Sequence, residues 1–282
     1  MSKAHPAQIH TNPNKLDSGQ QALVRARHLI KGIGPKKRLG QNFLIDLRVI
    51  EREIAYCKPD GKRILEIGPG LGAITHGLAE KASHLTAVEL DARFIYSLKD
   101  RLKQFNNVEI VHGDILEFNG GQFDVIISNL PYYIASKILF KIADMDFGFA
   151  IVCLQSELAE RMVARPASRG YSRFSVMCQF LFDTELLERV PSGAFYPEPK
   201  VESSIVRISK TGTVSKALSL FINAIFQHRN KKLRNAITDS RGMLGIDEKL
   251  ARKKTASMSL RDRRVITLSK EEILETFAEY SA

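Results

Sequence analysis

A glycine-rich loop between two acidic residues is the first feature whose residue types could do chemistry. Residues 65–73 read LEIGPGLGA, and Glu89 lies 21 positions after Gly68, at the end of the next apolar stretch. Glycines let a backbone turn tightly and approach a ligand, and the N–H groups that open the following helix favour polar or negative groups. A carboxylate at the position of Glu89 is typical of a ribose-binding residue. The loop therefore predicts a nucleoside-containing ligand held by Gly68, Gly70 and Glu89.

Two classes of cofactor fit this loop. Gly68-x-Gly70-x-x-Ala73 matches a dinucleotide fingerprint, which is a weak signal when it stands alone. S-adenosylmethionine has a ribose and an adenine but no pyrophosphate. Glu66, directly before the glycines, favours this second class, because a carboxylate repels a pyrophosphate but suits an ammonium and a sulfonium. Asp114, after the third predicted strand, could accept a hydrogen bond from an adenine amino group.

The tetrapeptide 129–132 (NLPY) follows the fourth predicted strand and faces the same edge of the sheet, where ligands bind in such folds. Its chemistry suits methylation of an aromatic amine, whose lone pair is delocalised into the ring. The Asn129 side-chain carbonyl and the backbone carbonyl of Leu130 or Pro131 could accept the two amine hydrogens and stabilise the charge that develops. Tyr132 offers a ring on which a base could stack. No strong general base is evident, and the chemistry requires none.

Strands and helices that alternate from residue 63 onward would position these groups. Strands are predicted at 63–67, 84–90, 108–112, 123–128, 149–154, 185–190 and 203–209, and helices at 71–80, 92–103, 134–142, 156–163 and 174–182. Repeated strand–helix units predict a mostly parallel α/β sheet covered on both faces. A Pro-rich loop joins the last two strands, which are expected to pair antiparallel as an edge hairpin.

The pattern changes after residue 210, where apolar residues at 218–226 recur with helical spacing and residues 269–272 fit a capping box. We therefore expect a basic N-terminal arm and helix at 1–35, with the helix at 18–31, a ligand-binding α/β domain at 36–209 and a small all-helical domain at 210–282.

The net charge of +11 is unevenly distributed over the 282 residues. Residues 1–38 contribute +7 and residues 207–282 contribute +8, whereas residues 39–206 contribute −4. Two basic ends around an acidic middle suggest that the ends bind phosphates while the middle does the chemistry.

Several protein classes are not expected. The three cysteines, at positions 57, 153 and 178, form no CxxC pair and no cluster with zinc-ligand spacing, which predicts buried thiols in a reducing compartment and no metal site. No apolar run approaches the about 18–20 residues of a membrane span. The first residues lack the apolar core of a secretory signal. We expect a cytoplasmic protein that binds neither membrane nor metal.

The motifs taken together resemble those of the small-subunit ribosomal RNA adenine N6,N6-dimethyltransferases, the kasugamycin-resistance family. The macrolide-resistance rRNA methyltransferases are relatives of that family. The resemblance covers about Lys36 to Arg207 and, more loosely, the helical tail. It is carried in order by GQNFL at 40–44, EIGPGLG at 66–72, Glu89, Gly113-Asp114, NLPY at 129–132 and FYPEPKVES at 195–203. The run at 227–235 (QHRNKKLRN) is most similar to archaeal and eukaryotic members.

The resemblance implies a Rossmann-like sheet of seven strands whose last pair is antiparallel, with S-adenosylmethionine as the cofactor. Asn42 and Leu44 would contact the methionine end of that cofactor. Phe195 would stack the target base opposite Tyr132. The implied cofactor-binding set is Gln41, Asn42, Leu44, Gly68, Gly70, Glu89, Asp114, Ile115 and Asn129. The implied catalytic set is Asn129, Leu130, Pro131, Tyr132 and Phe195. RNA binding is predicted for Lys36, Lys37, Arg38, Arg229, Lys231, Lys232 and Arg234.

The implied activity is dimethylation of two adjacent adenosines in a hairpin near the 3′ end of small-subunit rRNA. The implied partner is the immature small ribosomal subunit, and a monomer is expected. Two alternatives remain open. One is a methyltransferase of the macrolide-resistance type that acts on large-subunit rRNA, and the other is a non-catalytic assembly or transcription factor on the same fold.

Overall fold

The structure is a computed structural model that describes residues 30, 32, 34–36 and 39–282. The predicted N-terminal arm and nearly all of the predicted helix at 18–31 lie outside these residues. The chain divides into two compact units, each described here by itself. The first contains the residues up to 138 together with 190–200, and the second contains 139–189 and 201–282.

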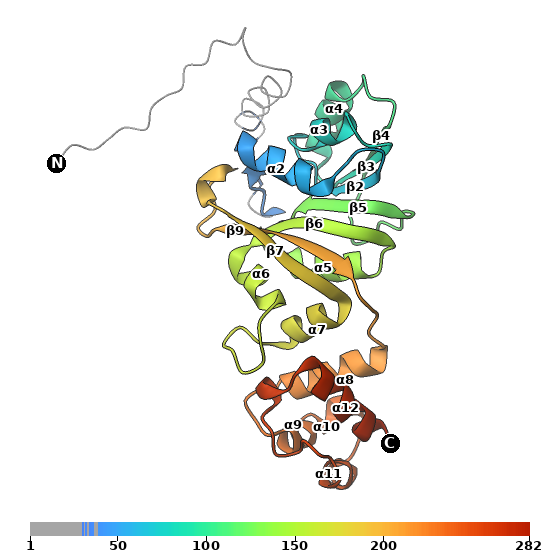
Figure 1. The fold of residues 1–282 in the computed structure, drawn as a ribbon, viewed down its shortest axis with the longest axis vertical. Helices are drawn as coiled ribbons and strands as arrows, with labels where there is room; N and C mark the ends of the chain where they lie inside the picture. Colours follow the sequence, from blue (N-terminus) through green and yellow to red (C-terminus); the bar gives the residue numbers. More distant parts are fainter. Residues whose placement is uncertain (1–29, 31, 33, 37–38) are drawn as a thin grey trace, which may run out of the picture. The chain divides into compact units, whose positions relative to one another are not determined.

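The predicted seven-stranded sheet with an antiparallel last pair is confirmed (Figure 1), and its strand order is β4-β3-β2-β5-β6-β9-β7. In the first unit β2 pairs in parallel with β3 and β5, and β3 pairs in parallel with β4. In the second unit β9 pairs antiparallel with β6. The strands are β2 Arg63–Ile67, β3 His84–Glu89, β4 Val108–His112, β5 Phe123–Asn129, β6 Phe147–Gln155, β7 Phe182–Val190 and β9 Ser203–Lys210.

The helices of the first unit turn apolar faces toward this sheet. They are α2 Leu47–Cys57, α3 Thr75–Ala79, α4 Ala92–Arg101 and the start of α5 Ala135–Ala143. Phe94 and Leu98, one turn apart on α4, are 1% exposed and pack with Leu71 and Leu102 in one buried cluster. In Figure 1, α3 and α4 lie beside the β3–β4 edge of the sheet. Because β2, β3, β4 and β5 run parallel, their carboxyl ends lie at the same edge of the sheet. The predicted site residues stand at this edge.

The helix expected at 71–80 is shorter than predicted, because it begins only at Thr75. The backbone at Gly68, Gly70 and Gly72 has φ of +70°, +55° and +77°, which a right-handed helix does not admit. The glycine loop therefore continues as turns for several residues beyond its expected end.

A two-stranded sheet that the sequence did not predict joins two motifs from opposite ends of the α/β region. β1 (Phe43–Leu44) pairs antiparallel with β8 (Phe195–Tyr196), with Leu44 opposite Phe195. The backbone N–H of Ile45 also donates to the carbonyl of Ala194 at 2.8 Å. The residues of the GQNFL motif and of the FYPEP motif are thus neighbours in the first unit.

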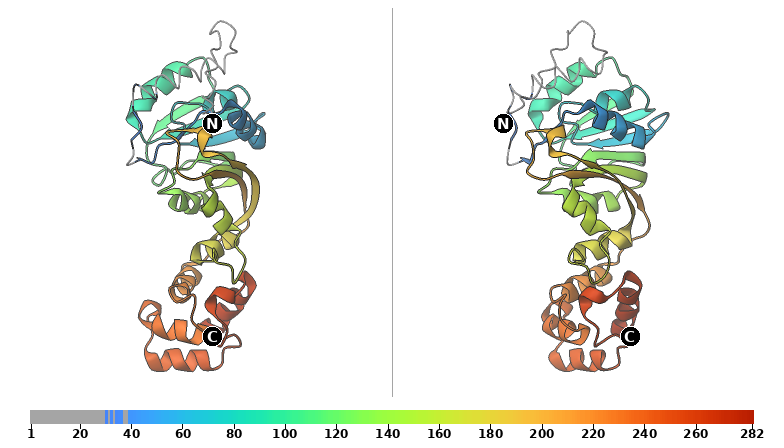
Figure 2. Two further views of the ribbon diagram at one scale, coloured as in Figure 1. Left: turned by 90° about the vertical axis from the view of Figure 1, so that its left-hand side faces the viewer. Right: turned by 60° about the vertical axis from the view of Figure 1, so that its left-hand side comes forward.

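The second unit contains β6, β7 and β9 and the helical C-terminal part of the chain. Its helices are α6 Ser156–Met162, α7 Arg173–Leu181, α8 Lys216–Phe226, α9 Leu233–Asp239, α10 Arg241–Leu244, α11 Glu248–Ala256 and α12 Lys270–Ser281, with α8–α12 grouped in Figure 2. The predicted capping box opens α12, where the Ser269 and Glu272 side chains each accept from the other residue's backbone N–H. Within the described ranges, every helix is too short or too polar to cross a membrane.

Candidate functional site

The glycine loop is closed by the carboxylate of Glu89. Glu89 Oε2 accepts from the backbone N–H of Gly70 at 2.8 Å, and Oε1 accepts from the N–H of Asp91 at 2.7 Å. A Cβ placed on Gly68 would meet no atom within 4 Å, whereas one on Gly70 would lie 3.1 Å from the Phe43 ring. Gly68 therefore borders open space that a ligand can use. Gly70 must be glycine both for its positive φ and for the packing of Phe43.

Glu89 is a buried carboxylate that keeps spare capacity to accept hydrogen bonds. It is 6% exposed, and burial raises its pKa, although the backbone N–H groups of Asp91, Gly70 and Leu90 act in the opposite direction. An ionised carboxylate offers about four lone-pair sites, of which the loop uses two. The capacity that remains suits hydroxyl donors of a ligand.

Asp114 stands close to Glu89 at the neighbouring strand end. The backbone N–H of Gly113 donates to the carbonyl of Glu89 at 3.0 Å, which ties the turn after β4 to the end of β3. Asp114 Oδ1 accepts from the N–H of Leu116 at 2.9 Å, and Ile115 is buried beside it. Glu89, Asp114 and Ile115 thus lie at the ends of two neighbouring strands of the sheet.

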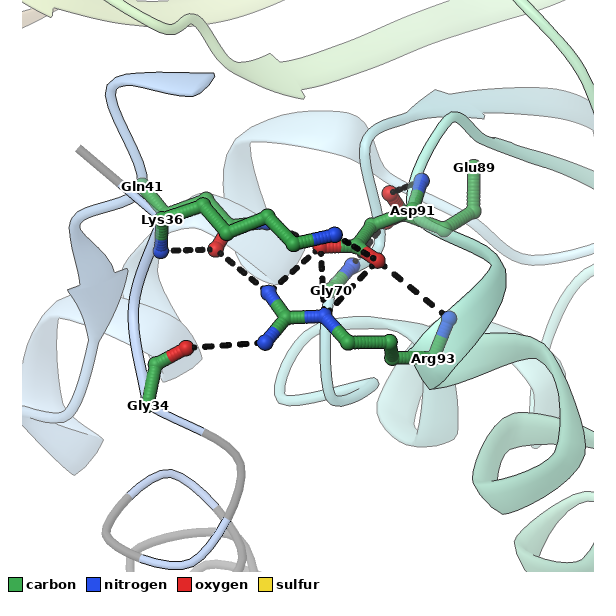
Figure 3. A network of polar contacts seen from close by, with 7 residues as sticks. All are labelled: Gly34, Lys36, Gln41, Gly70, Glu89, Asp91 and Arg93. Atoms are coloured by element: carbon green, nitrogen blue, oxygen red, sulfur yellow. Dashed lines mark hydrogen bonds and ion pairs between the residues drawn. The ribbon is translucent and has the colours of Figure 1, made fainter. Parts of the chain in front are cut away.

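A polar network that the sequence analysis missed lies directly beside Glu89 (Figure 3). At its centre is Asp91, whose side chain is 2% exposed and forms ion pairs with Arg93 at 2.7 Å and with Lys36 at 3.3 Å. Gln41 Nε2 donates to Asp91 Oδ2 at 3.0 Å, and Arg93 also donates to the Gly34 carbonyl at 3.1 Å. These donors, Arg93 first, hold the pKa of Asp91 well below its usual range.

The network gives two predicted site residues a structural partner. The Gln41 amide donates to Asp91 and accepts from the Lys36 backbone N–H at 2.8 Å, and the Lys36 ammonium lies on Asp91. The chain around 34–42 is thereby attached to the turn that carries Glu89. An acidic residue two positions after Glu89 was the available signal for this contact.

Asn42 and Leu44 belong to the same segment as Gln41. Asn42 Nδ2 donates to the Gly40 carbonyl at 3.4 Å, a long hydrogen bond, and Leu44 is buried against β8. Phe195, opposite Leu44, is only 5% exposed, so its ring belongs to the packed part of this small sheet.

Asn129 ends β5 and presents one atom that lacks a partner. Its Nδ2 donates to Glu53 Oε2 at 3.2 Å, whereas its buried Oδ1 has no hydrogen-bond donor among the described residues. Leu130 is buried, Pro131 and Tyr132 are half-buried, and Tyr133 is 59% exposed. The tetrapeptide therefore carries an open acceptor and, three residues later, a half-buried aromatic side chain.

Glu53 was not among the predicted site residues, because no helix or strand was predicted at 45–57. Asp46 caps α2 by accepting from the N–H groups of Arg48 and Val49. The buried residues of α2 recur as one face at Val49, Ile50, Glu53 and Cys57. An N-cap residue followed by this spacing was the signal that could have found the helix and its one buried carboxylate.

Glu66 supplies a second open acceptor at the end of β2. It is 3% exposed, and its Oε2 has no hydrogen-bond partner within the described part of the chain. Burial, together with the nearby charge of Glu89, raises the pKa of Glu66 to about 8. A buried acceptor of this kind suits a cationic ligand with N–H donors and does not suit a pyrophosphate.

The predicted basic residues of the tail gather in the second unit. Backbone hydrogen bonds join 229–234 to 261–266, among them Leu233 N–H to the Arg263 carbonyl at 2.8 Å. A hollow of about 920 Å³ lies there and is lined by six cationic side chains and Asp239. The six are Lys231, Lys232, Arg234, Arg252, Arg261 and Arg264. Three of the four predicted tail residues thus share one basic surface.

Several of the predicted RNA-binding side chains of the tail already have partners within the protein. Lys231 pairs with Asp239 at 2.8 Å, and Asp262 pairs with Lys232 at 3.2 Å and with Arg234 at 2.8 Å. Arg229 lies outside the hollow and donates to the Tyr171 carbonyl at 2.8 Å. The predicted RNA-binding residues Lys37 and Arg38 lie outside the described residues.

The chain is similar to known proteins along most of its length. A family model described as "Ribosomal RNA adenine dimethylase" matches residues 34–281. Relatives named ribosomal RNA small subunit methyltransferase A are 40% identical over 246 residues in Pyrococcus abyssi, covering 86% of this chain and 91% of the relative. The relative in Methanopyrus kandleri is 39% identical over 268 residues, covering 91% and 95%.

Two solved structures share the fold. A dimethyladenosine transferase from Plasmodium falciparum is similar with a TM-score of 0.74 and 24% identity, covering 85% of this chain and 97% of that one. The 23S rRNA methyltransferase ErmE is similar with a TM-score of 0.62 and 26% identity, covering 86% and 100%.

Proposed function

Because the chain belongs to the ribosomal RNA adenine dimethylase family, we propose that its acidic α/β site transfers methyl groups to two adjacent adenosines of small-subunit rRNA. The enzyme is an rRNA adenine dimethyltransferase, and S-adenosylmethionine is its methyl donor. The hairpin near the 3′ end of the small-subunit rRNA is the proposed target. The relatives in Pyrococcus abyssi and Methanopyrus kandleri support the small subunit by their names, whereas the ErmE structure supports the large-subunit alternative through the fold and 26% identity.

The residues present fit S-adenosylmethionine. The buried carboxyl of Glu66 suits the cationic methionine end, and Asn42 and Leu44 are proposed to border it. Glu89 has acceptor sites left for the ribose, and Asp114 and Ile115 stand where the adenine is expected. The open space at Gly68 admits the ligand next to the backbone. The bound cofactor supplies a methyl group on a positively charged sulfur.

Asn129 Oδ1 is the observation that carries the proposal. Among the described residues it is a buried acceptor without a donor, at the end of β5, which pairs with β2, the strand that leads into the glycine loop. An adenine 6-amino group that donates one hydrogen to Asn129 Oδ1 and the other to the carbonyl of Leu130 or Pro131 is held in place. As its nitrogen becomes positive, both acceptors stabilise the charge. Removing such a group typically costs about 10²–10³ in kcat.

Tyr132 is proposed to stack on the target base, which must leave the RNA structure to reach the site. Phe195 is proposed to stack on the opposite face of the same base. Because the Phe195 side chain is buried, its ring must become exposed when the base binds. The protein is proposed to act as a monomer. The substrate supports the predicted cytoplasmic location.

The basic hollow of the second unit is proposed to bind the rRNA backbone. Six cationic side chains outnumber the acids beside them, and an RNA phosphate can replace the carboxylates of Asp239 and Asp262 as a partner. Such contacts give affinity without reading sequence.

Methyl transfer from labelled S-adenosylmethionine to isolated small and large subunits that lack the modification tests the function. We expect the small subunit to be labelled by the wild type, with the Asn129→Ala variant at least about 100-fold slower. Labelling of the large subunit alone favours the macrolide-resistance type. Full activity of Asn129→Ala contradicts the catalytic role of Asn129. Binding of the small subunit without any transfer favours the assembly factor.

A further inference from the structure

Glu53 is a carboxylate in a place where α2 otherwise buries apolar groups. It is 1% exposed and shares its helix face with Val49, Ile50 and Cys57. Moving a carboxylate from water into such surroundings costs several kcal/mol unless it gains strong partners. The side chain of Asn129 is one such partner, at 3.2 Å, and it joins α2 to the end of β5 within the first unit.

We propose that Glu53 is a positioning residue that fixes the orientation of the Asn129 side-chain amide. An ionised carboxylate can only accept hydrogen bonds, so it bonds to the NH₂ end of that amide and not to its oxygen. With Nδ2 on Glu53, the other end of the amide, Oδ1, is left as the open acceptor. The inference rests on the proposed role of Asn129 in holding the adenine amine.

The opposite orientation would be harmful to the reaction. If the amide turned over, its NH₂ group would face the adenine amine, which itself presents two N–H donors and a nitrogen that becomes positive. Two facing donors repel, and the charge that develops would meet no acceptor. Glu53 fixes the orientation of the Asn129 amide before the substrate binds. The amide therefore does not have to rearrange as the transition state forms.

The isosteric variant Glu53→Gln separates this role from a role in packing. A glutamine keeps the volume but can accept from Nδ2 or donate to Oδ1, so both amide orientations become accessible. We expect kcat for methyl transfer to small subunits to fall about 10- to 100-fold, as is typical when the group orienting a site residue is lost. The KM for the subunit and the Kd for S-adenosylmethionine should each stay within about twofold, since Glu53 is argued to touch neither.

Val49→Ala is the matched control, because Val49 is also buried on the same helix face as Glu53. It should lower Tm by removing buried volume while leaving kcat unchanged. A Glu53→Gln variant that keeps the wild-type kcat overturns the inference. The inference is also overturned if the kcat of Glu53→Gln falls only in proportion to its folded fraction, as the kcat of Val49→Ala would if that variant lost activity through instability.

NMR of the Asn129 side-chain amide in the full-length protein gives a second readout. Its signals are assigned by their loss in Asn129→Ala. We expect one set of NH₂ resonances shifted by the carboxylate in the wild type, and a changed or doubled set in Glu53→Gln. Signals identical in both proteins overturn the inference, whatever the activity. If the wild type methylates no subunit, the proposed function fails, yet this spectrum still tests the amide orientation.

Discussion

Glu89 accepts a hydrogen bond from the backbone N–H of Gly70 at 2.8 Å, so the carboxylate predicted to hold a ribose also closes the glycine loop. The carboxylate accepts from the backbone N–H groups of Gly70 and Asp91. In a Glu89→Gln variant, one of these N–H groups would face the NH₂ group of the glutamine side chain. We expect the affinity for S-adenosylmethionine, measured by calorimetry, to fall at least about tenfold, because a buried donor is left unpaired. Glu109→Gln, at an exposed position of β4, is the control and should bind normally.

The raised pKa of Glu66 predicts a pH-dependent stability. The folded protein keeps a proton on Glu66 up to about pH 8, whereas the unfolded chain loses it near 4.5. Between these values the folded state binds more protons, so the free energy of unfolding falls as pH rises. We expect the Tm of Glu66→Gln, relative to the Tm of the wild type, to rise as the pH increases from 5.5 to 8. A Tm difference that is constant over this range means that Glu66 is ionised throughout.

We expect Asp91 to support cofactor binding indirectly, because its network attaches the chain around 34–42 to the turn that carries Glu89. Asp91→Asn loses the charge that attracts Lys36 and Arg93, at 3.3 and 2.7 Å. We predict a loss of about 1–3 kcal/mol in the free energy of unfolding and weaker binding of S-adenosylmethionine. Denaturant titration and calorimetry measure the two effects, and unchanged values for both would show that the network is dispensable.

Lys36 was predicted to bind RNA, yet its ammonium lies on Asp91 with the side chain 33% exposed. The variant Lys36→Met distinguishes the two roles. If the contact with Asp91 is its function, cofactor affinity falls and the salt dependence of subunit binding is unchanged. If Lys36 also meets a phosphate, the slope of log K against log salt drops by about one.

The basic hollow should govern the salt dependence of subunit binding. Neutralising Lys231, Lys232 and Arg234 should weaken binding and reduce the salt slope by about two to three, because each phosphate contact contributes about 0.7–0.9. Asp262→Asn should do the reverse, since it frees Lys232 and Arg234 for phosphates. Cofactor affinity should stay the same in both variants, and an equal loss of cofactor affinity would mark the tail as a stability element.

The sequence predicts local features well and distant pairings poorly. β2 and β4 have the predicted bounds, and the capping box of α12 is where its spacing indicates, because apolar periodicity and caps are local signals. The pairing of β1 with β8 could not be predicted, since strands of two residues have no periodicity and their partners are far apart in the chain.

The candidate site divides in the same way. Glycine loop, strand-end acids and tetrapeptide follow strands that the sequence predicts, so Glu89, Asp114 and Asn129 stand at one edge of the sheet as expected. Glu53 and Asp91 escaped prediction for a different reason. Each acts by contact with a residue from another element, Asn129 for one and Lys36 for the other, and such contacts exist only once the chain has folded.

Nucleoside mass spectrometry of small-subunit rRNA treated with the wild-type enzyme and S-adenosylmethionine tests the central claim most directly. The account predicts N6,N6-dimethyladenosine at two adjacent positions in the hairpin near the 3′ end, formed at least about 100-fold more slowly by Asn129→Ala. Monomethyladenosine as the end product, or dimethyladenosine only in large-subunit rRNA, would contradict it.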